Sequence, residues 1–401
     1  MVPLWQKIKN NRKLEIEKGN VKMSINKLLQ SKRIGSAIAA ALLVVIILVV
    51  MGTGLLSLGL HGRMLASRTA SEIAARCAAD AGLTKAVFEM NEKLKVRPWD
   101  DNTLPQETDA ILAPSDATFT YTITSSPDYI YTVDVTGRAG RGIKNISCTL
   151  TLVGLFRNAV YAQDSLVLEN AFLIDAYSSE DGPYGGVNAL QPTTVATGDP
   201  NGVAMGSGTI YGDVLIDYGR ELPAISPPEG EEFAVSKGIL TDTVVISENG
   251  KYDYIELKSD ATITISGDVT LYVTGFFETR TYSEVEILPD SSLTLYLGGD
   301  MNLRNTSTVN NLTQEPKRCQ VFGIGTTDQS FLMEQSSVFY GTIYAPDATV
   351  SLENGAELYG AIIADNADLR NSAELHFDAT LLKTSVSEIG AEFIVQHWQE
   401  E

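Results

Sequence analysis

The sequence predicts a mainly β protein. We expect an N-terminal transmembrane and stalk α-helix, a small antiparallel sheet, and then a single-stranded parallel β-helix (β-solenoid). Three observations predict this fold class: an uncharged apolar run near the N-terminus, alternating β-branched and aromatic residues after it, and a short motif that repeats near the C-terminus. The predicted segments are 1–33, a basic cytoplasmic leader; 34–96, the transmembrane and stalk helix; 97–154, the small antiparallel sheet; 155–382, the β-solenoid; and 383–401, a C-terminal cap.

The uncharged run Ile34–Leu60 is long enough to cross a bilayer. A membrane helix needs about 20 apolar residues, and these 27 residues would span about 40 Å. The preceding leader carries nine Lys and Arg against two Glu, so the positive-inside rule keeps the N-terminus in the cytoplasm. A cleaved signal peptide is disfavoured, because the run continues through Gly52 without a small-residue cleavage boundary. We therefore expect a single-pass protein of the cytoplasmic (inner) membrane, with the lipid bilayer as a partner and a periplasmic or extracellular body.

The net charge is divided unevenly along the chain. The total is −20, but residues 1–33 contribute +7, so the remainder carries −27. An acidic surface of this kind repels nucleic-acid phosphates. We therefore expect no nucleic-acid partner.

A second set of features lies around the apolar run. Arg33 precedes Gly35, Ser36 and an apolar span, and residues 78–83 read Ala-Ala-Asp-Ala-Gly-Leu. This segment, about 33–95, resembles the N-terminal domain of PilX-like type IV pilus (minor pilin-like) proteins. The resemblance implies a membrane helix that can pack into a pilus or pseudopilus, pilin-like subunits or pilus assembly machinery as partners, and prepilin-type processing between Gly35 and Ser36. Ala40 stands where pilins carry a glutamate after that cleavage site, which leaves a tethered scaffold outside any pilus as an alternative.

Beyond the stalk the sequence changes to a strand pattern. Pro98 ends the helix, and three alternating stretches follow, covering 119–124, 129–135 and 143–150. Turn residues separate them, which predicts an antiparallel meander packed against the stalk helix. This part is similar to the small sheet of a pilin head.

The clearest internal repeat lies near the C-terminus. Glu334–Gly341 recurs as Glu353–Gly360 and again as Arg370–Phe377, at offsets of 19 and 17 residues. A period below 20 residues is too short for a helix-containing repeat and fits one coil of a β-solenoid. The irregular coil lengths favour a right-handed one. Asn354 and Asn371 would occupy equivalent corners, where asparagine tolerates left-handed backbone geometry. The apolar residues expected to point inward are Val338, Ile343, Val350, Leu352, Leu358, Ile362, Leu369 and Leu375.

Several motifs from residue 155 onward are shared with a known domain. They lie at 156–161, 174–179, 340–346 and 397–400. They are similar to an uncharacterised β-helical C-terminal domain often found behind PilX-like N-termini, which would cover about 155–401. The resemblance implies architecture and no established activity. We also expect an exposed Pro- and Glu-rich insertion at Pro223–Glu232, and 386–398 covering an open solenoid end.

Catalysis is disfavoured. Many β-helices cleave polysaccharides, and inverting glycoside cleavage needs two carboxylates about 6.5–9.5 Å apart. The sequence has no paired Asp-Asp or Gly-His-Gly signature, no Ser-His-Asp set, no phosphate-binding loop and no HExxH motif. We therefore assign no catalytic residue. The isolated acids considered are Asp175, Asp213 and Asp217, and each is expected to be surface charge. The histidines are His61 at the membrane edge, His376 in a repeat strand and His397 in the tail.

Metal and disulfide sites are not predicted either. Calcium is the one cofactor with candidate clusters, at 100–102 and 180–182, but neither matches a known calcium loop and solvated loops are favoured. Cys77, Cys148 and Cys319 lack metal-ligand spacing. Export would permit a Cys148–Cys319 bridge, although three separate buried thiols are favoured.

The expected function is structural. We predict a membrane-anchored, pilin-like protein that displays a β-solenoid for cell-envelope assembly or adhesion to a partner, surface or glycan. The alternative is an envelope carbohydrate-binding or carbohydrate-cleaving β-helix protein, since aromatic residues could stack on sugars if they formed one exposed ladder. Burial at equivalent repeat positions is the competing explanation for Tyr340 and Tyr359, and Tyr344 is the candidate for surface contact. The aromatic residues considered were Tyr211, Tyr340, Tyr344 and Tyr359.

Overall fold

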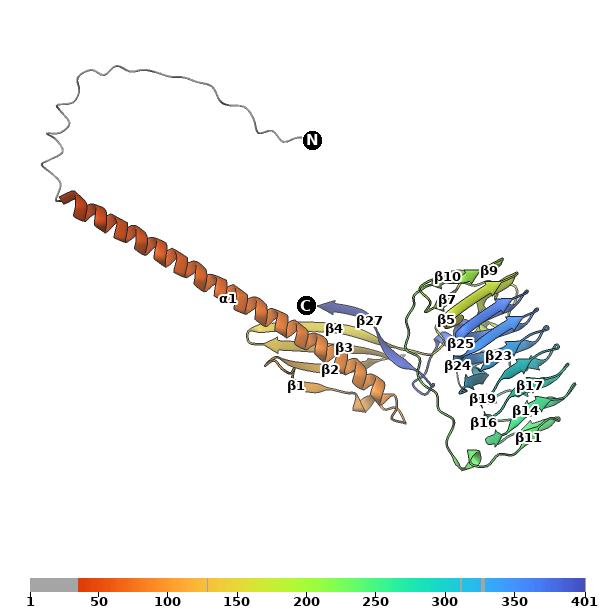
Figure 1. Ribbon diagram of the computed structural model, residues 1–401. Coiled ribbons are helices and arrows are strands. Elements are labelled where there is room, and N and C mark those ends of the chain that lie inside the picture. Colours follow the sequence, from red (N-terminus) through yellow and green to blue (C-terminus); the bar gives the residue numbers. More distant parts are fainter. Residues whose placement is uncertain (1–34, 128, 311, 326–328, 401) are drawn as a thin grey trace, which may run out of the picture.

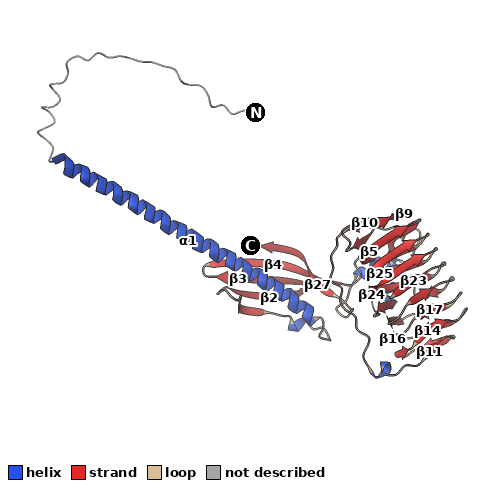
Figure 2. Ribbon diagram, in the orientation of Figure 1, coloured by secondary structure: helices blue, strands red, loops and turns tan. Residues whose placement is uncertain are grey.

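The computed structural model describes residues 35–127, 129–310, 312–325 and 329–400. These residues form one long apolar helix and two sheets, so the protein is mainly β (Figures 1 and 2). The predicted basic leader, residues 1–33, lies outside the described residues.

Helix α1 (Gly35–Lys93) has two different halves. Every described side chain from Ile38 to Ala70 is exposed, and the helix is long and apolar enough to cross a membrane. Figure 1 shows this half projecting away from the rest of the molecule. The second half is rich in alanine and packs against a sheet, with Ala75, Ala79 and Ala86 fully buried. One continuous helix thus joins an apolar rod to a folded domain.

The first sheet is small and antiparallel, and we call it, together with the second half of α1, the head. Tyr121, Val133 and Leu150 lie in its core beneath the helix. Small residues permit this close contact: a Cβ atom at Gly137 would lie 2.0 Å from the backbone oxygen of Ala75. The predicted meander is confirmed in β2, β3 and β4. In sheet order the strands are β1 (Glu107–Ile111), β2 (Thr118–Ser126), β3 (Ile130–Ala139), β4 (Gly142–Val153) and β27 (Glu392–Glu400).

The second sheet has 22 strands among the described residues, and its strand pairings are parallel. Most strands pair with the strand three places further along the chain, so the strands form three columns, and we call this assembly the stack. The first column holds β11 (Ile239–Leu240), β14 (Tyr254–Leu257), β17 (Phe277–Thr279), β20 (Met301–Leu303), β23 (Ser330–Met333), the last parts of β24 (Val338–Glu353) and β25 (Glu357–Arg370), the last part of β5 (Val160–Glu169), and β8 (Ala204–Met205).

The other two columns are built in the same way. The second holds β12 (Val244–Ile246), β15 (Thr262–Ile265), β18 (Glu284–Ile287), β21 (Thr308–Val309), the first parts of β24 and β25, β26 (Glu374–Asp378), β6 (Phe172–Tyr177) and β9 (Gly208–Ile210). The third holds β13 (Gly250–Tyr252), β16 (Asp268–Val273), β19 (Ser292–Leu297), β22 (Cys319–Gly323), the middle parts of β24 and β25, the first part of β5, β7 (Thr193–Thr197) and β10 (Gly212–Leu215).

The chain enters the stack in its middle. From β5 it runs to one end at β10, and residues 216–238 then lead along the side to the opposite end at β11 (Figure 1, green). From β11 the chain returns until β25 and β26 pair with β5 and β6, as in the register pair Leu375 and Ile174. The predicted insertion Pro223–Glu232 belongs to this connector. It is mostly exposed, although Ile225 packs against the core.

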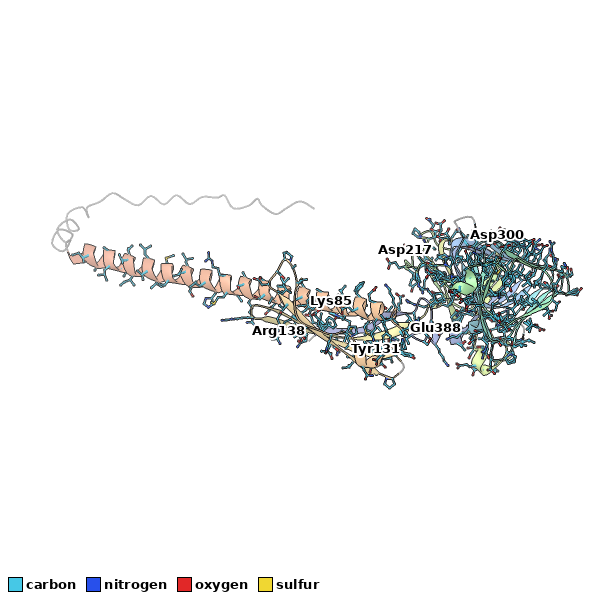
Figure 3. All side chains as sticks on the ribbon, turned by 90° about the horizontal axis from the view of Figure 1, so that it is seen from below. Lys85, Tyr131, Arg138, Asp217, Asp300 and Glu388 are labelled. Atoms are coloured by element: carbon cyan, nitrogen blue, oxygen red, sulfur yellow. The ribbon has the colours of Figure 1, made fainter. Side chains whose placement is uncertain are left out.

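The predicted C-terminal cap is wrong. Instead of covering an end of the stack, β27 pairs antiparallel with β4 and completes the head sheet. The physical reason is Phe393, which is buried between Trp99 and Tyr131 in the head core. Two segments therefore connect head and stack, one entering after β4 and one leaving before β27. Figure 3 shows Glu388 between the two parts.

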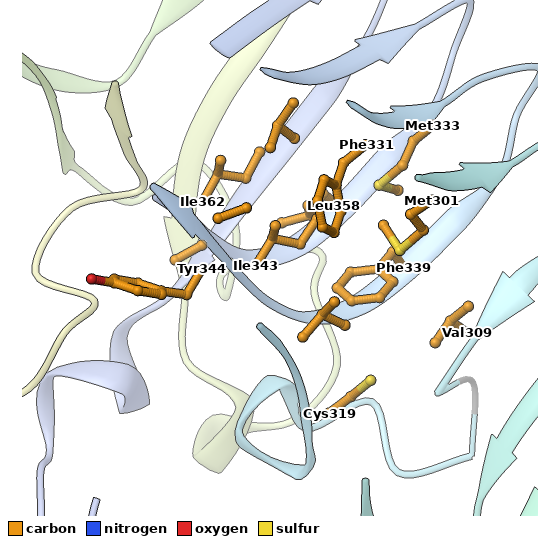
Figure 4. Close-up of a cluster of buried hydrophobic side chains, with 14 of the residues drawn as sticks. Met301, Val309, Cys319, Phe331, Met333, Phe339, Ile343, Tyr344, Leu358 and Ile362 are labelled. Atoms are coloured by element: carbon orange, nitrogen blue, oxygen red, sulfur yellow. The ribbon is translucent and has the colours of Figure 1, made fainter. Parts of the chain in front are cut away.

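The core of the stack is formed by inward-facing apolar side chains (Figure 4). Of the residues predicted to point inward, all but Val338 are buried. Val338 is half-buried because it is in register with Glu357 and, one strand further, Glu374, which share an outward-facing position. The prediction that Val338 points inward is therefore wrong, because its side chain lies on the outward face of the strand.

The three cysteines are separate, as favoured from the sequence, but the expected burial is confirmed only for Cys148 and Cys319 and is wrong for Cys77. Cys148 lies in the head core and Cys319 in the stack core, so the alternative Cys148–Cys319 bridge is excluded. Burial raises the pKa of the Cys148 thiol to about 11 and that of Cys319 to about 12, whereas Cys77 is exposed on α1.

Because the thiolate is the nucleophile, alkylation should distinguish the three residues. We expect iodoacetamide at pH 8 to modify Cys77 in the folded protein and to reach Cys148 and Cys319 only after denaturation. Peptide mass spectrometry before and after addition of guanidinium measures this. Equal labelling of all three thiols without denaturant would contradict the two cores.

Candidate functional site

A buried polar cluster lies on the outward face of the second column. Tyr340, Tyr359, His376 and Asp175 come from β24, β25, β26 and β6 and occupy successive register positions. The rings of Tyr340 and Tyr359 are stacked at 4.4 Å and 12°, and Tyr359 lies 4.7 Å from the imidazole of His376. The spacing follows from the ladder, because neighbouring parallel strands lie about 4.8 Å apart. We call these four residues the aromatic column.

The loop between β6 and β7, residues 178–192, covers the aromatic column. Tyr184 places its ring 3.9 Å from that of His376. Its hydroxyl donates a 2.7 Å hydrogen bond to Asp175 Oδ2, and the backbone N–H of Leu190 donates to the same oxygen at 2.9 Å. Tyr184 also contacts the rings of Tyr359 and Tyr177, so aromatic contacts and two hydrogen bonds to the Asp175 carboxylate hold this part of the loop.

Most polar atoms of the cluster have a hydrogen-bond partner among the described residues, whereas His376 Nε2 is buried without one. His376 Nδ1 lies 2.6 Å from Asp175 Oδ1, and both side chains are completely buried. On the other side of the ring, His376 Nε2 lies 3.3 Å from Glu374 Oε2. The Tyr359 hydroxyl donates to Glu357 at 2.9 Å. Burial, followed by these bonds to carboxylates, raises the pKa of Tyr359 and of Tyr184, so both hydroxyls stay protonated and act as donors.

A second buried carboxylate, Asp378, joins the start of the covering loop to the segment that follows β26. Asp378 accepts hydrogen bonds from the backbone N–H and hydroxyl of Ser179 and from those of Thr380. It thereby caps the short 3₁₀ helix η5 (Ala379–Leu382), through which the chain leaves the stack. Beside it an open depression of about 640 Å³ is lined by Tyr177, Ser178, Asp181, Asn188 and Gln191, among others.

The hydrogen bonds of the cluster connect the covering loop to the strands beneath it. A nucleophilic site needs a hydroxyl or thiol hydrogen-bonded to its base. In the described part of the chain Ser179 bonds to Asp378, while His376 bonds to Asp175, so the serine and the histidine belong to separate pairs. His376 is also fully buried. The arrangement positions the loop over the stack.

The prediction for Tyr344 is wrong. The side chain is fully buried, and its hydroxyl donates a 2.6 Å hydrogen bond to the carbonyl of Pro223. The connector covers this position, which the repeat pattern could not reveal. Figure 4 shows the ring directed away from the apolar cluster around Ile343. Tyr359 is buried too, while Tyr211 remains exposed, so the four tyrosines considered form no single exposed ladder.

The remaining predicted residues are scattered. Gly35 and Ser36 begin α1, but their side chains lie outside the described set. Asp213 and Asp217 are exposed, whereas Asp175 is buried in the cluster. His61 bonds to a backbone carbonyl on the exposed helix, and His397 is exposed on β27.

In the two candidate calcium clusters, three carboxylates are engaged in hydrogen bonds or an ion pair within the protein. Asp100 caps the 3₁₀ helix η1 (Asp101–Thr103), Asp101 accepts hydrogen bonds from Trp99 and Tyr131, and Glu180 pairs with Lys383. Within the described ranges no group of three or more His, Cys, Asp or Glu is placed to hold a metal ion.

Sequence reasoning missed the covering loop. The equivalence of Tyr340, Tyr359 and His376 was visible in the repeat alignment, but nothing in the sequence placed Tyr184 over His376. The only signal was the interval between β6 and β7, which is longer than the other turns of the repeat. A long interval containing an aromatic residue is therefore the signal that could have found it.

A second ladder confirms the corner role predicted for asparagine. Asn354 and Asn371 have φ of 55° and 56°, and Asn170 has φ of 55°. The side-chain amide of Asn170 donates to Asn371 Oδ1 at 3.1 Å, and that of Asn371 donates to Asn354 Oδ1 at 3.2 Å. Asn170 belongs to the entering coil, so this ladder runs across the junction between the two parts of the stack.

Asn371 offers a graded test of this corner. We expect Asn371→Ala to lower the free energy of unfolding by about 2 kcal/mol, because alanine loses the ladder bonds and is strained at positive φ. Asn371→Gly should cost only about 1 kcal/mol, because glycine accepts that conformation. Urea unfolding followed by circular dichroism measures both. Equal effects of the two substitutions would show that the backbone conformation contributes nothing.

Comparison with known proteins gives limited information. Residues 228–384 match the family model described as "Domain of unknown function (DUF7305)", which is less than half of the chain and omits β5–β10. No curated protein matches. Among solved structures the chain is similar to the competence-associated pilin ComZ from Thermus thermophilus, with 10% sequence identity and a TM-score of 0.22, covering 82% of this chain and 98% of that one. At that TM-score the similarity carries no argument.

Proposed function

We propose that this protein is a membrane-anchored, pilin-like structural protein that displays a β-solenoid outside the cytoplasmic membrane. The observation that carries the proposal is the division of α1. Its first half is apolar and exposed, and its second half packs against the small head sheet. The chain passes from β4 of that sheet into the stack and returns from the stack to β27. An exposed apolar helix of this length is stable in a bilayer and costly in water.

The solenoid part of the proposal is supported by the strand ladders. Three columns of parallel strands, an asparagine ladder and inward-facing apolar residues are the expected features of coils that stack on one another. We propose a single-stranded β-solenoid, and a right-handed one. Its role is assembly and display: the rigid body offers a long surface for contact.

Orientation and partners follow from the anchor. The proposal places the basic leader in the cytoplasm and the body in the periplasm or outside the cell. Pilin-like subunits or a pilus assembly machinery are the proposed partners, with processing before Ser36. The tethered scaffold that never joins a pilus differs only in retaining its leader.

The proposal assigns no catalysis and no cofactor to the protein. Among the described residues, the buried pair of His376 and Asp175 is bonded to the Tyr184 hydroxyl of the covering loop, and to no serine or threonine hydroxyl and no thiol. Carbohydrate binding is not favoured, because Tyr359 is buried under Tyr184 and Tyr344 under the connector.

Two measurements test the proposal on the full chain. Membrane fractionation, with protease added to intact cells, permeabilised cells and spheroplasts, should show a membrane protein whose body is cleaved only from outside the cytoplasmic membrane. A soluble cytoplasmic protein would refute the proposal. Mass spectrometry of the mature N-terminus separates the two forms: Ser36 as first residue indicates prepilin-type processing, and an intact leader indicates a permanent anchor.

A further inference from the structure

The two ends of the stack are finished differently. At the β11 end, the connector forms an additional layer: the 3₁₀ helix η3 (Glu231–Phe233) lies against β13 with Phe233 buried. Lys237 and Gly238 continue this layer, with Lys237 N donating to Lys251 O at 2.7 Å and Gly238 O accepting from Asp253 N at 2.9 Å. The third column is therefore covered at this end.

The opposite end is left open within the described residues. Strands β8, β9 and β10 have no pairing partner on their outer side, so all three columns end in free strand edges. Met205 is in register with the fully buried Leu168 and therefore faces the core, yet it is 54% exposed. Leu215 and Ile216 are also exposed there. We call residues 204–216 the open end.

Free strand edges and an uncovered core restrict what can bind. The edges supply unpaired backbone N–H and C=O groups, and the core supplies apolar surface. Water can bond to the backbone groups but leaves the apolar core uncovered, whereas an occupant with strand edges around an apolar centre satisfies both. Another open end has this shape, because it carries the same three edges around the same core.

From these features we propose that the open end is a contact surface through which two copies of this chain associate, with β8–β10 of one copy pairing with those of the other. A two-fold axis across the open ends pairs the strands in antiparallel fashion. The β11 end is a poorer match, since its third column is already covered.

The anchor is compatible with this contact, and the geometry here rests on the proposed function. Figure 1 shows the stack running obliquely to α1, with β9 and β10 at one end and β11 at the other. The proposal requires a two-fold axis along the membrane normal, because only then do the helices of two copies anchored in one membrane point the same way.

Charge sets a condition on the association. Asp213 in the open end and Asp217, the residue directly after it, are exposed, and a two-fold contact brings each carboxylate towards its equivalent in the other copy. Salt screens such repulsion, with a Debye length of about 10 Å at 0.1 M. Association should therefore strengthen between 20 and 200 mM NaCl, the reverse of a contact held by salt bridges.

The test uses the full chain in detergent, by sedimentation velocity over a concentration series together with hydrogen exchange. For the wild type we expect a dimer and slowed exchange in residues 204–216 at high concentration. Met205→Lys should weaken association at least tenfold and restore fast exchange there. Leu215→Lys serves as a second variant, and thermal unfolding verifies that each remains folded. Val245 is a strand residue of the β11 end and is 65% exposed, so Val245→Lys is the control and should associate like wild type.

Three outcomes would overturn the inference: a wild type that stays monomeric at all concentrations, equal association of Met205→Lys and Val245→Lys, or a dimer in which residues 204–216 exchange as fast as in the monomer. A dimer lost in Phe88→Lys but kept in Met205→Lys would place the contact on α1. None of these results would change membrane fractionation, so failure here is distinguishable from failure of the proposed function.

Discussion

Gly360→Val should lower the free energy of unfolding of the stack by about 3–5 kcal/mol. Gly360 has φ of 142°, where side chains are strained, and an added Cβ would lie 1.9 Å from the backbone oxygen of Gly341 on the neighbouring strand. The clash is with backbone, so no side-chain rotation relieves it. The expected loss combines the cost of overpacking with that of backbone strain.

Hydrogen exchange is the appropriate measurement for this substitution. Of the three tryptophans, Trp99 and Trp398 lie in the head and Trp5 lies outside the described residues, so tryptophan fluorescence is not a specific probe of the stack. We expect faster exchange in residues 338–370, with little change in β2–β4. Gly355→Ala is the matched control: its φ is also positive, but the nearest atom to its Cβ would be Ser336 Oγ at 3.5 Å, so about 1 kcal/mol is expected. Equal effects at both glycines would contradict the contact with Gly341.

The repeat made the column of Tyr340, Tyr359 and His376 predictable. Residues at equivalent places of a short repeat must occupy one column if each copy is one layer, and the register pairs and the 4.4 Å ring spacing confirm this for Tyr340 and Tyr359. The asparagine corners were predictable for the same reason. The sequence repeat therefore predicts which residues stack, because residues at equivalent positions of successive repeats occupy the same place in successive layers.

The wrong predictions for Tyr344 and for the C-terminal cap share a different cause. Tyr344 is buried by Pro223, which lies 121 residues earlier in the chain, and Phe393 packs beside Trp99 in the head. Both contacts join segments that no period relates. The mid-stack entry of the chain is of the same kind, since β25 continues onto β5 rather than onto a later coil. A repeat predicts neighbours within its own series and is silent about segments that cross it.

The candidate site shows the same limit. His376 belongs to the repeat and was placed in a strand, but its partner Asp175 comes from the first coil and Tyr184 from the loop that follows. Each isolated acid was expected to be solvated, and Asp175 is instead fully buried. Its burial depends on the join between β26 and β6, which has no sequence signature.

The second large effect on the free energy of unfolding is expected at the junction between β26 and β6. We expect Asp175→Ala to cost about 3–5 kcal/mol, because the substitution leaves three donors without an acceptor in a buried place: the His376 imidazole, the Tyr184 hydroxyl and the Leu190 N–H. Asp175→Asn keeps one oxygen and should cost about half as much. Glu374→Gln, on the partly exposed side of the ring, should cost under about 1 kcal/mol.

The location of the loss distinguishes a structural tie from a solvated acid. If Asp175 fastens the loop, limited proteolysis of Asp175→Ala should cut first within residues 178–192, before any cut in β14–β22, and hydrogen exchange of β26 should rise with it. Glu374→Gln should show neither change. Intact protection of the loop in Asp175→Ala would mean that Asp378 and its bonds to Ser179 hold the segment alone. In that case the histidine–aspartate pair would contribute only to the junction between β26 and β6.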